Sequence, residues 1–301
     1  MRKPLFWLVA ILTIIIVVPE AIIGAPIPPE IKTTVGFVYV LNEKNEKVPN
    51  GTGFFVGVKN PKKEGFSTVH FVTAKHVLQT SNRKNWLPGF FLRLNKKDGT
   101  MDYMSVPIIT EGEKKTVYTH PEPDVDLAVI PMLPDSEVFD FKFLPDNMLT
   151  TKKDFEDLNI REGSDVFFTG LFSPYPGYEK NYPIVRFGRV ALITEERIEL
   201  EKDLKMDLYL IETSSFGGNS GSPVFFHLGS DRSPGSIIFG PPIIKIAGVM
   251  KGSFLDVEPL RIIETSKILG APSSMGISAV IPAYKLHELL FGEELKKKRG
   301  F

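Results

Sequence analysis

The sequence predicts an all-β fold of antiparallel strands. Short runs rich in β-branched and aromatic residues recur along most of the chain, with turn residues between them, a pattern typical of β-sandwiches and barrels. Apolar residues at helical spacing occur in only two segments, 74–80 and 283–291. Strands are expected at residues 34–41, 53–58, 68–73, 90–94, 126–132, 165–168, 185–193, 208–212, 223–226, 243–250 and 276–281.

A polar stretch at residues 146–163 divides these strands into two halves and is expected to join two compact units. The 301 residues suffice for one large domain or two small ones. We expect one unit over residues 33–158 and the other over 159–291. A basic tail follows at 292–301, and its cations at 296–299 are expected to be solvated.

The composition excludes several functional classes. The 36 basic residues balance the 36 acidic ones, so no net field attracts nucleic acid. The absence of cysteine removes thiol catalysis, cysteine-ligated zinc and disulfides from consideration. We therefore expect no nucleic-acid partner, no metal ion and no cofactor.

The first 25 residues have the outline of an export signal, with Arg2 and Lys3 before an apolar run. This run has 14 residues, 5–18, and as a helix it rises about 21 Å, short of the roughly 30 Å hydrocarbon core of a bilayer. Both a cleaved signal peptide and a retained membrane anchor fit, and a Pro-rich linker follows at 26–32. The expected location is extracytoplasmic: secreted, periplasmic or tethered through residues 5–18.

A turn dense in small residues, 217–223, surrounds Ser220 and precedes an apolar strand. Glycine beside a serine lets backbone N–H groups point to one place, which is what a developing oxyanion needs. The G-x-S-x-G elbow of α/β-hydrolases does not fit, because Ser222 stands where that motif has its second glycine. Ser220 is therefore a candidate nucleophile of another fold.

A serine nucleophile needs a neighbouring base, for which histidine is the usual residue. His76 lies where an apolar strand breaks into a helical turn, and the ends of strands are suited to hold catalytic groups. We expect structural or solvated roles for the remaining four histidines, His70, His120, His227 and His287.

Asp126 stands at the start of an apolar strand, where a buried charge needs a partner. The N–H of the His76 ring would satisfy the Asp126 carboxylate and leave the other ring nitrogen free to accept a serine proton. Asp124 is the alternative carboxylate partner for His76, but it lies farther from the strand and is expected to be a solvated turn residue.

The order His76, Asp126, Ser220 matches the chymotrypsin arrangement. The sequence resembles the trypsin-like serine proteases, and within them the cysteine-free enzymes of the Deg or high-temperature-requirement type. The resemblance extends over residues 33–291 and implies two six-stranded antiparallel β-barrels with a C-terminal helix. The segments that carry it are 51–54, 73–77, 126–129, 218–223, 247–249 and 276–282.

The resemblance implies a serine endopeptidase acting on proteins or peptides. Its general base would be His76, its orienting carboxylate Asp126, its nucleophile Ser220, and its oxyanion hole the amides of Gly218 and Ser220. Ten residues follow Phe291, so no PDZ domain is expected. Two other classes stay open: a catalytically silent protein-binding domain on the same fold, and a serine esterase.

Two further expectations rest on the resemblance. Asn219 replaces the aspartate that pairs with a newly cut amino terminus in digestive relatives, which predicts activity without such cleavage. Ungapped counting places Ser214 near the base of the primary specificity pocket, and the wall at Lys251, Gly252 and Ser253. No carboxylate is clearly placed there, which favours uncharged side chains at P1.

Overall fold

The computed structural model describes residues 26–109, 115–201, 204–229, 240–261 and 268–300. The expected export segment lies outside these residues. Within them, no helix is long and apolar enough to cross a membrane.

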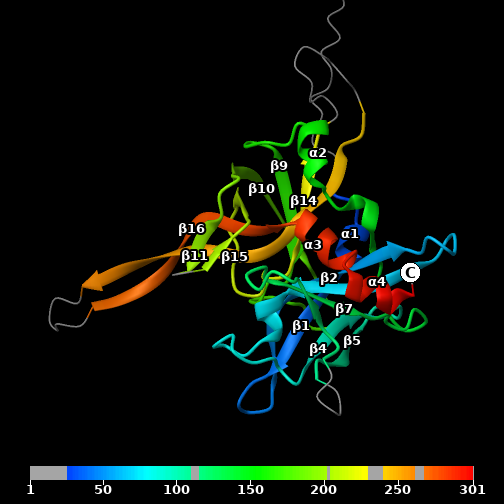
Figure 1. The fold of residues 1–301 in the computed structure, drawn as a ribbon. Coiled ribbons are helices and arrows are strands. Elements are labelled where there is room, and N and C mark those ends of the chain that lie inside the picture. Colours follow the sequence, from blue (N-terminus) through cyan, green and yellow to red (C-terminus); the bar gives the residue numbers. More distant parts are fainter. Residues whose placement is uncertain (1–25, 110–114, 202–203, 230–239, 262–267, 301) are drawn as a thin grey trace, which may run out of the picture.

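Strands dominate the described chain, as the sequence predicts (Figure 1). The strands before the central polar stretch are β1 (Val35–Leu41), β2 (Lys47–Lys59), β3 (Ser67–Ala74), β4 (Gly89–Asn95), β5 (Met101–Pro107), β6 (Tyr118–Thr119), β7 (Leu127–Pro131) and β8 (Leu144–Pro145). Those after it are β9 (Asp165–Gly170), β10 (Ile184–Ile193), β11 (Ile198–Glu201), β12 (Leu204–Met206), β13 (Tyr209–Glu212), β14 (Pro223–Leu228), β15 (Ile243–Arg261) and β16 (Ile268–Pro282). The helical elements are α1 (Glu30–Thr33), η1 (Lys75–Leu78), η2 (Asp146–Met148), α2 (Lys152–Asp157), α3 (Ala283–Leu290) and α4 (Glu293–Arg299).

The first half of the chain forms one sheet in the order β5-β4-β1-β2-β3-β7-β6, with β8 pairing parallel to β2. Its six longer strands are antiparallel, and the two-residue strands β6 and β8 add to them. Successive side chains of a strand point to opposite faces. On β2, Phe54 and Val56 therefore enter one core, while Phe55 between them enters another.

The second half closes into a six-stranded barrel in the order β10-β13-β16-β15-β14-β9, as the sequence resemblance predicts. Phe167 of β9 and Phe225 of β14 stack at a centroid distance of 4.8 Å. Both rings belong to the cluster that also contains Phe37 and Phe54 of the first sheet. One hydrophobic core thus joins the two halves and fixes how they meet.

The C-terminal residues differ from the expected solvated tail. They form helix α4, which follows α3 (both red in Figure 1), and Leu295 of α4 is buried in the shared core. Arg299 Nη1 lies 3.5 Å from His70 Nε2 on β3. The apolar side of α4 is carried by a single leucine among many charges, too weak a signal to reveal the helix from sequence.

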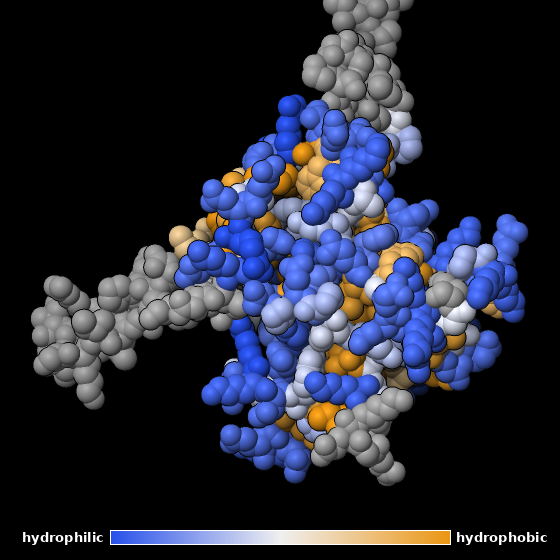
Figure 2. Space-filling view, in the orientation of Figure 1, coloured by the Kyte–Doolittle hydropathy of each residue, from blue (hydrophilic) through white to orange (hydrophobic). Residues whose placement is uncertain are grey.

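The surface seen in Figure 2 is mostly hydrophilic, and its apolar residues form small separate patches. Among the described residues, the exposed aromatic side chains are Phe66, Phe143, Tyr175, Tyr178, Tyr182, Phe187 and Phe216. The large apolar side chains are otherwise concentrated inside, where they stabilise the packing of the two halves.

Replacing Phe225 by alanine removes a fully buried ring from the core shared by both halves. We expect Phe225→Ala to lower the free energy of unfolding by about 3–5 kcal/mol. Urea denaturation followed by fluorescence measures the change. Tyr178→Ala, at a side chain 85% exposed, is the matched control, and an equal loss in both variants would contradict the assignment of the core.

Candidate active site

The register of two neighbouring strands brings His76 to Asp126. β3 pairs antiparallel with β7 so that Ala74, at the end of β3, lies opposite Leu127, at the start of β7. Asp126, just before β7, therefore lies next to the turn that follows β3 and contains His76. His76 Nδ1 lies 2.6 Å from Asp126 Oδ2, and the backbone N–H of His76 donates to Oδ1 at 2.9 Å.

The Asp126 carboxylate determines which nitrogen of the neutral His76 ring carries the proton. Asp126 is 4% exposed. Burial alone would raise the pKa of the Asp126 carboxyl, but the charges and hydrogen bonds of His76 and Lys251 hold it well below its usual range. Because an ionised carboxylate only accepts hydrogen bonds, the proton sits on Nδ1 and leaves Nε2 as an acceptor.

Lys251 is a second partner of the same carboxylate. Its Nζ lies 2.9 Å from Asp126 Oδ2, and its side chain is nearly fully buried. Sequence reasoning placed Lys251 on the pocket wall and did not foresee this ion pair. The signal was present: Lys251 follows the apolar run of β15, where a charge needs a partner for the same reason as Asp126.

Ser220 lies beside this pair but is not hydrogen-bonded to it. Its hydroxyl donates to the carbonyl oxygen of Lys251 at 3.0 Å, and within the described chain no hydrogen bond joins it to the His76 ring. Both residues have a neighbour at Gly51, where an added Cβ would meet the Val77 side chain, next to His76, and the carbonyl oxygen of Ser220. Catalytic hydrogen bonds of this kind are often unformed before substrate binds.

The turn around Ser220 depends on two glycines in the left-handed region, Gly218 at φ +95° and Gly221 at φ +87°. A Cβ on Gly221 would lie 2.0 Å from the carbonyl oxygen of Thr52, so only glycine fits. In the described residues, the amides of Gly218 and Ser220 have no hydrogen-bond acceptor. Two free donors are thus available where an oxyanion hole is expected.

Asn219 holds this turn from inside the protein. It is 1% exposed. Its Oδ1 accepts from the amide of Phe216 at 2.8 Å, and its Nδ2 donates to the carbonyl of Leu171 at 2.6 Å. A carboxylate could accept the first bond but could not donate the second. The turn is therefore tied down without an ion pair to a chain terminus.

Thr52 connects the two halves at the site, and sequence reasoning assigned it no role. Its hydroxyl donates to the carbonyl of Gly218 at 2.7 Å and accepts from the amide of Leu171 at 3.0 Å. Its own amide donates to the carbonyl of Ser220 at 2.9 Å. Thr52 is fully buried, so these bonds hold the first sheet directly against the Ser220 turn.

The expected pocket residues come together around three serine hydroxyls. Ser253 Oγ donates to the carbonyl of Ser215 at 2.8 Å and also contacts Ser215 Oγ. Ser278 Oγ lies 2.9 Å from Ser215 Oγ. Ser253 thereby joins the wall segment, which includes Gly252, to the base segment that contains Ser214.

The guanidinium of Arg186 contacts the segment that contains Ser214. Arg186 Nη1 donates to the carbonyl of Ser214 at 3.1 Å, and the Arg186 side chain stacks on the Phe216 ring. Glu212, the carboxylate nearest to the pocket in sequence, is exposed on β13. The surroundings of the expected pocket base are therefore rich in hydroxyl groups, with a positive charge next to them.

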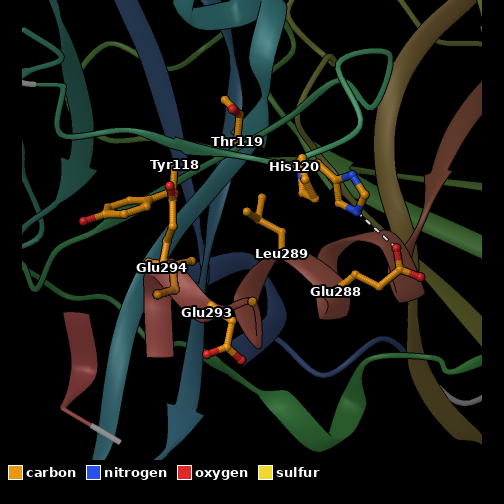
Figure 3. A pocket seen from close by; sticks show the side chains of 10 residues that line it. Tyr118, Thr119, His120, Glu288, Leu289, Glu293 and Glu294 are labelled. Atoms are coloured by element: carbon orange, nitrogen blue, oxygen red, sulfur yellow. Dashed lines mark hydrogen bonds and ion pairs between the residues drawn. The ribbon is translucent and has the colours of Figure 1, made fainter. Parts of the chain in front are cut away.

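The remaining histidines have other partners. Burial, followed by the charge of Arg299, lowers the pKa of His70 to about 4. His120 lines a cavity of about 540 Å³ against α3 and α4, where its Nε2 contacts Glu288 (Figure 3). His287 stacks on the Phe291 ring, and His227 lies near the Phe167 ring.

Two carboxylates near His120 already face a cation. Lys285 Nζ lies 2.7 Å from Glu122 and 3.6 Å from Glu288, so an ammonium compensates their charge. Asp124, the competing carboxylate near the site, is paired with Arg197 at 3.3 Å. Within the described chain, none of these three carboxylates contacts the His76 ring, whose carboxylate partner is Asp126.

The fold and the site define a trypsin-like peptidase domain. Residues 51–230 match the family model described as a trypsin-like peptidase domain. This match spans more than half of the chain, which therefore belongs to that family. Among solved structures, one titled "Crystal structure of Deg5" is similar at 19% identity and a TM-score of 0.44, covering 86% of this chain and 88% of that chain. No curated protein matches the sequence.

Removing the Thr52 hydroxyl leaves the carbonyl of Gly218 and the amide of Leu171 without their partner. We expect Thr52→Val to lower kcat by about 10- to 100-fold, because small displacements of a catalytic group are costly, with little change in KM. Steady-state kinetics on a peptide ester measures both constants. Thr52→Ser keeps the hydroxyl and is the control; an unchanged kcat in Thr52→Val would refute the role.

Proposed function

We propose that this protein is a serine endopeptidase that hydrolyses protein substrates through an acyl-enzyme, with His76, Asp126 and Ser220 as its triad. The observation that supports this most is the His76 ring, which Asp126 holds with Nε2 as an acceptor, together with the amides of Gly218 and Ser220, which have no acceptor within the described chain. Membership of the trypsin-like peptidase family supports the same conclusion.

The reaction starts when Ser220 Oγ leaves the carbonyl of Lys251 and turns to His76 Nε2. His76 takes the hydroxyl proton while Oγ attacks the substrate carbonyl, and the amides of Gly218 and Ser220 donate to the oxyanion. The protonated His76 then gives its proton to the leaving amine, which leaves an ester on Ser220. Water deprotonated by His76 hydrolyses that ester and restores the serine.

The same proposal gives a preference for small, uncharged side chains at P1. Ser253 links the wall to the base of the expected pocket through Ser215, and such a link would leave less room for a long side chain. Arg186 behind Ser214 disfavours a basic side chain by charge repulsion. The serine hydroxyls suit a neutral group.

A fluorophosphonate probe together with casein hydrolysis tests the function. We expect the purified protein to be labelled by the probe and to hydrolyse casein, while its intact mass shows no internal cleavage. We expect Ser220→Ala to lose both labelling and hydrolysis. Ser222→Ala is the matched control, because the buried Ser222 hydroxyl has no hydrogen-bond partner among the described residues and lies two residues away.

The outcomes separate the competing functions. Labelling with ester hydrolysis but no casein cleavage would point to an esterase. A folded protein without labelling or hydrolysis would be a binding domain on this fold. Activity that appears only after cleavage within the domain would contradict the role of Asn219 as an internal tether.

A peptide library with varied P1 residues tests the pocket. We expect kcat/KM to be at least about tenfold higher for alanine or valine than for lysine or arginine, since roughly one unfavourable contact of 1.4 kcal/mol suffices for that ratio. Ser253→Gly removes the link to Ser215 and is expected to extend cleavage to larger neutral side chains. Preferred cleavage after basic residues would overturn the assignment.

A further inference from the structure

Lys251 contacts both ends of the proposed triad. Its carbonyl accepts the Ser220 hydroxyl at 3.0 Å, and its Nζ lies 2.9 Å from Asp126 Oδ2. The same Oδ2 lies 2.6 Å from His76 Nδ1. One carboxylate oxygen is therefore shared by the ring that acts as base and by a buried ammonium.

The backbone of the Ser220 turn fixes the place of Lys251. The amide of Gly221 donates to the carbonyl of Met250 at 2.8 Å, and the amide of Met250 donates to the carbonyl of Ser222 at 2.9 Å. These bonds clamp the middle of β15 to the turn, so the ammonium of Lys251, the next residue, reaches Asp126 from a fixed origin. The contact between Lys251 Nζ and Asp126 is therefore held in place by backbone hydrogen bonds of the site.

Two other charged groups near Asp126 have partners elsewhere. A cavity of about 200 Å³ lies beside His76. Lys75 Nζ is bound by the carbonyl of Pro123 at 2.6 Å, and Asp124 is paired with Arg197. Lys251 is the lysine that contacts the Asp126 carboxylate directly. The other charged groups that line this cavity are Lys75, Arg83 and Asp124.

We propose that Lys251 is a positioning residue for the reaction, which holds Asp126 for His76 and extends the working range of the base toward lower pH. This rests on the proposed function. With Lys251 present, protonation of His76 takes the buried group of three from zero net charge to +1. Without the ammonium, the same step takes a negative pair to neutral, which costs less in a buried site.

The pH dependence of kcat/KM tests the proposal. Lys251→Met keeps the length and removes the charge, and we expect it to move the acid limb of the profile to higher pH by about one unit. Lys251→Arg keeps the charge and is the matched control, with its acid limb near that of the wild type. An acid limb at the same pH in both variants would overturn the proposal.

A second measurement does not depend on turnover. In the Ser220→Ala background, NMR titration follows the ring resonances of His76 with and without Lys251→Met, and the midpoint is expected to rise by the same amount. If the wild type hydrolyses nothing, the proposed function fails while this titration still decides the role of Lys251. Lys251→Gln is the second neutral variant.

Three results are distinguishable. A raised midpoint in either neutral variant supports the proposal, and an unchanged midpoint overturns it. Failure of both neutral variants to fold, alongside a folded Lys251→Arg, would also overturn it, because Lys251 would then serve to stabilise the fold.

Discussion

The buried carboxylate of Asp126 is the constraint on which the site depends. A charge at 4% exposure needs close partners, and the β3–β7 register supplies one of them by placing His76 where the two strands end. Strand β15 supplies the other, Lys251. The orientation of the ring, its tautomer and the location of the ammonium all follow from compensating one negative charge.

The site also requires that the sheet of the first half and the barrel of the second half pack in a fixed relative position. The shared core does this broadly through stacked rings such as Phe167 and Phe225. Thr52 does it locally, because its hydroxyl and amide bind Gly218 and Ser220 of the turn and Leu171, the residue after β9. Hydrophobic burial brings the halves together without direction, and the directional bonds of Thr52 then set their alignment at the site.

Sequence reasoning recovered the features with local signals. Alternating apolar runs and turn residues gave the strand series, and a charge beside an apolar strand gave Asp126 its histidine partner. It missed β5, whose polar and apolar residues do not alternate cleanly, and α4, whose buried face is Leu295 alone. The roles of Thr52 and Lys251 depend on contacts between residues far apart in the chain, and no local pattern specifies which distant group a threonine or lysine will meet.

The contacts of Thr52 also set an order of events during synthesis. Its partners Leu171 and Gly218 lie 119 and 166 residues later in the chain. The first sheet can therefore leave the ribosome long before the groups that align it with the Ser220 turn exist. Leu295, which belongs to the same shared core, comes later in the sequence than both partners of Thr52. The alignment of Ser220 with His76 and Asp126 thus depends on residues that are synthesised well after the first sheet.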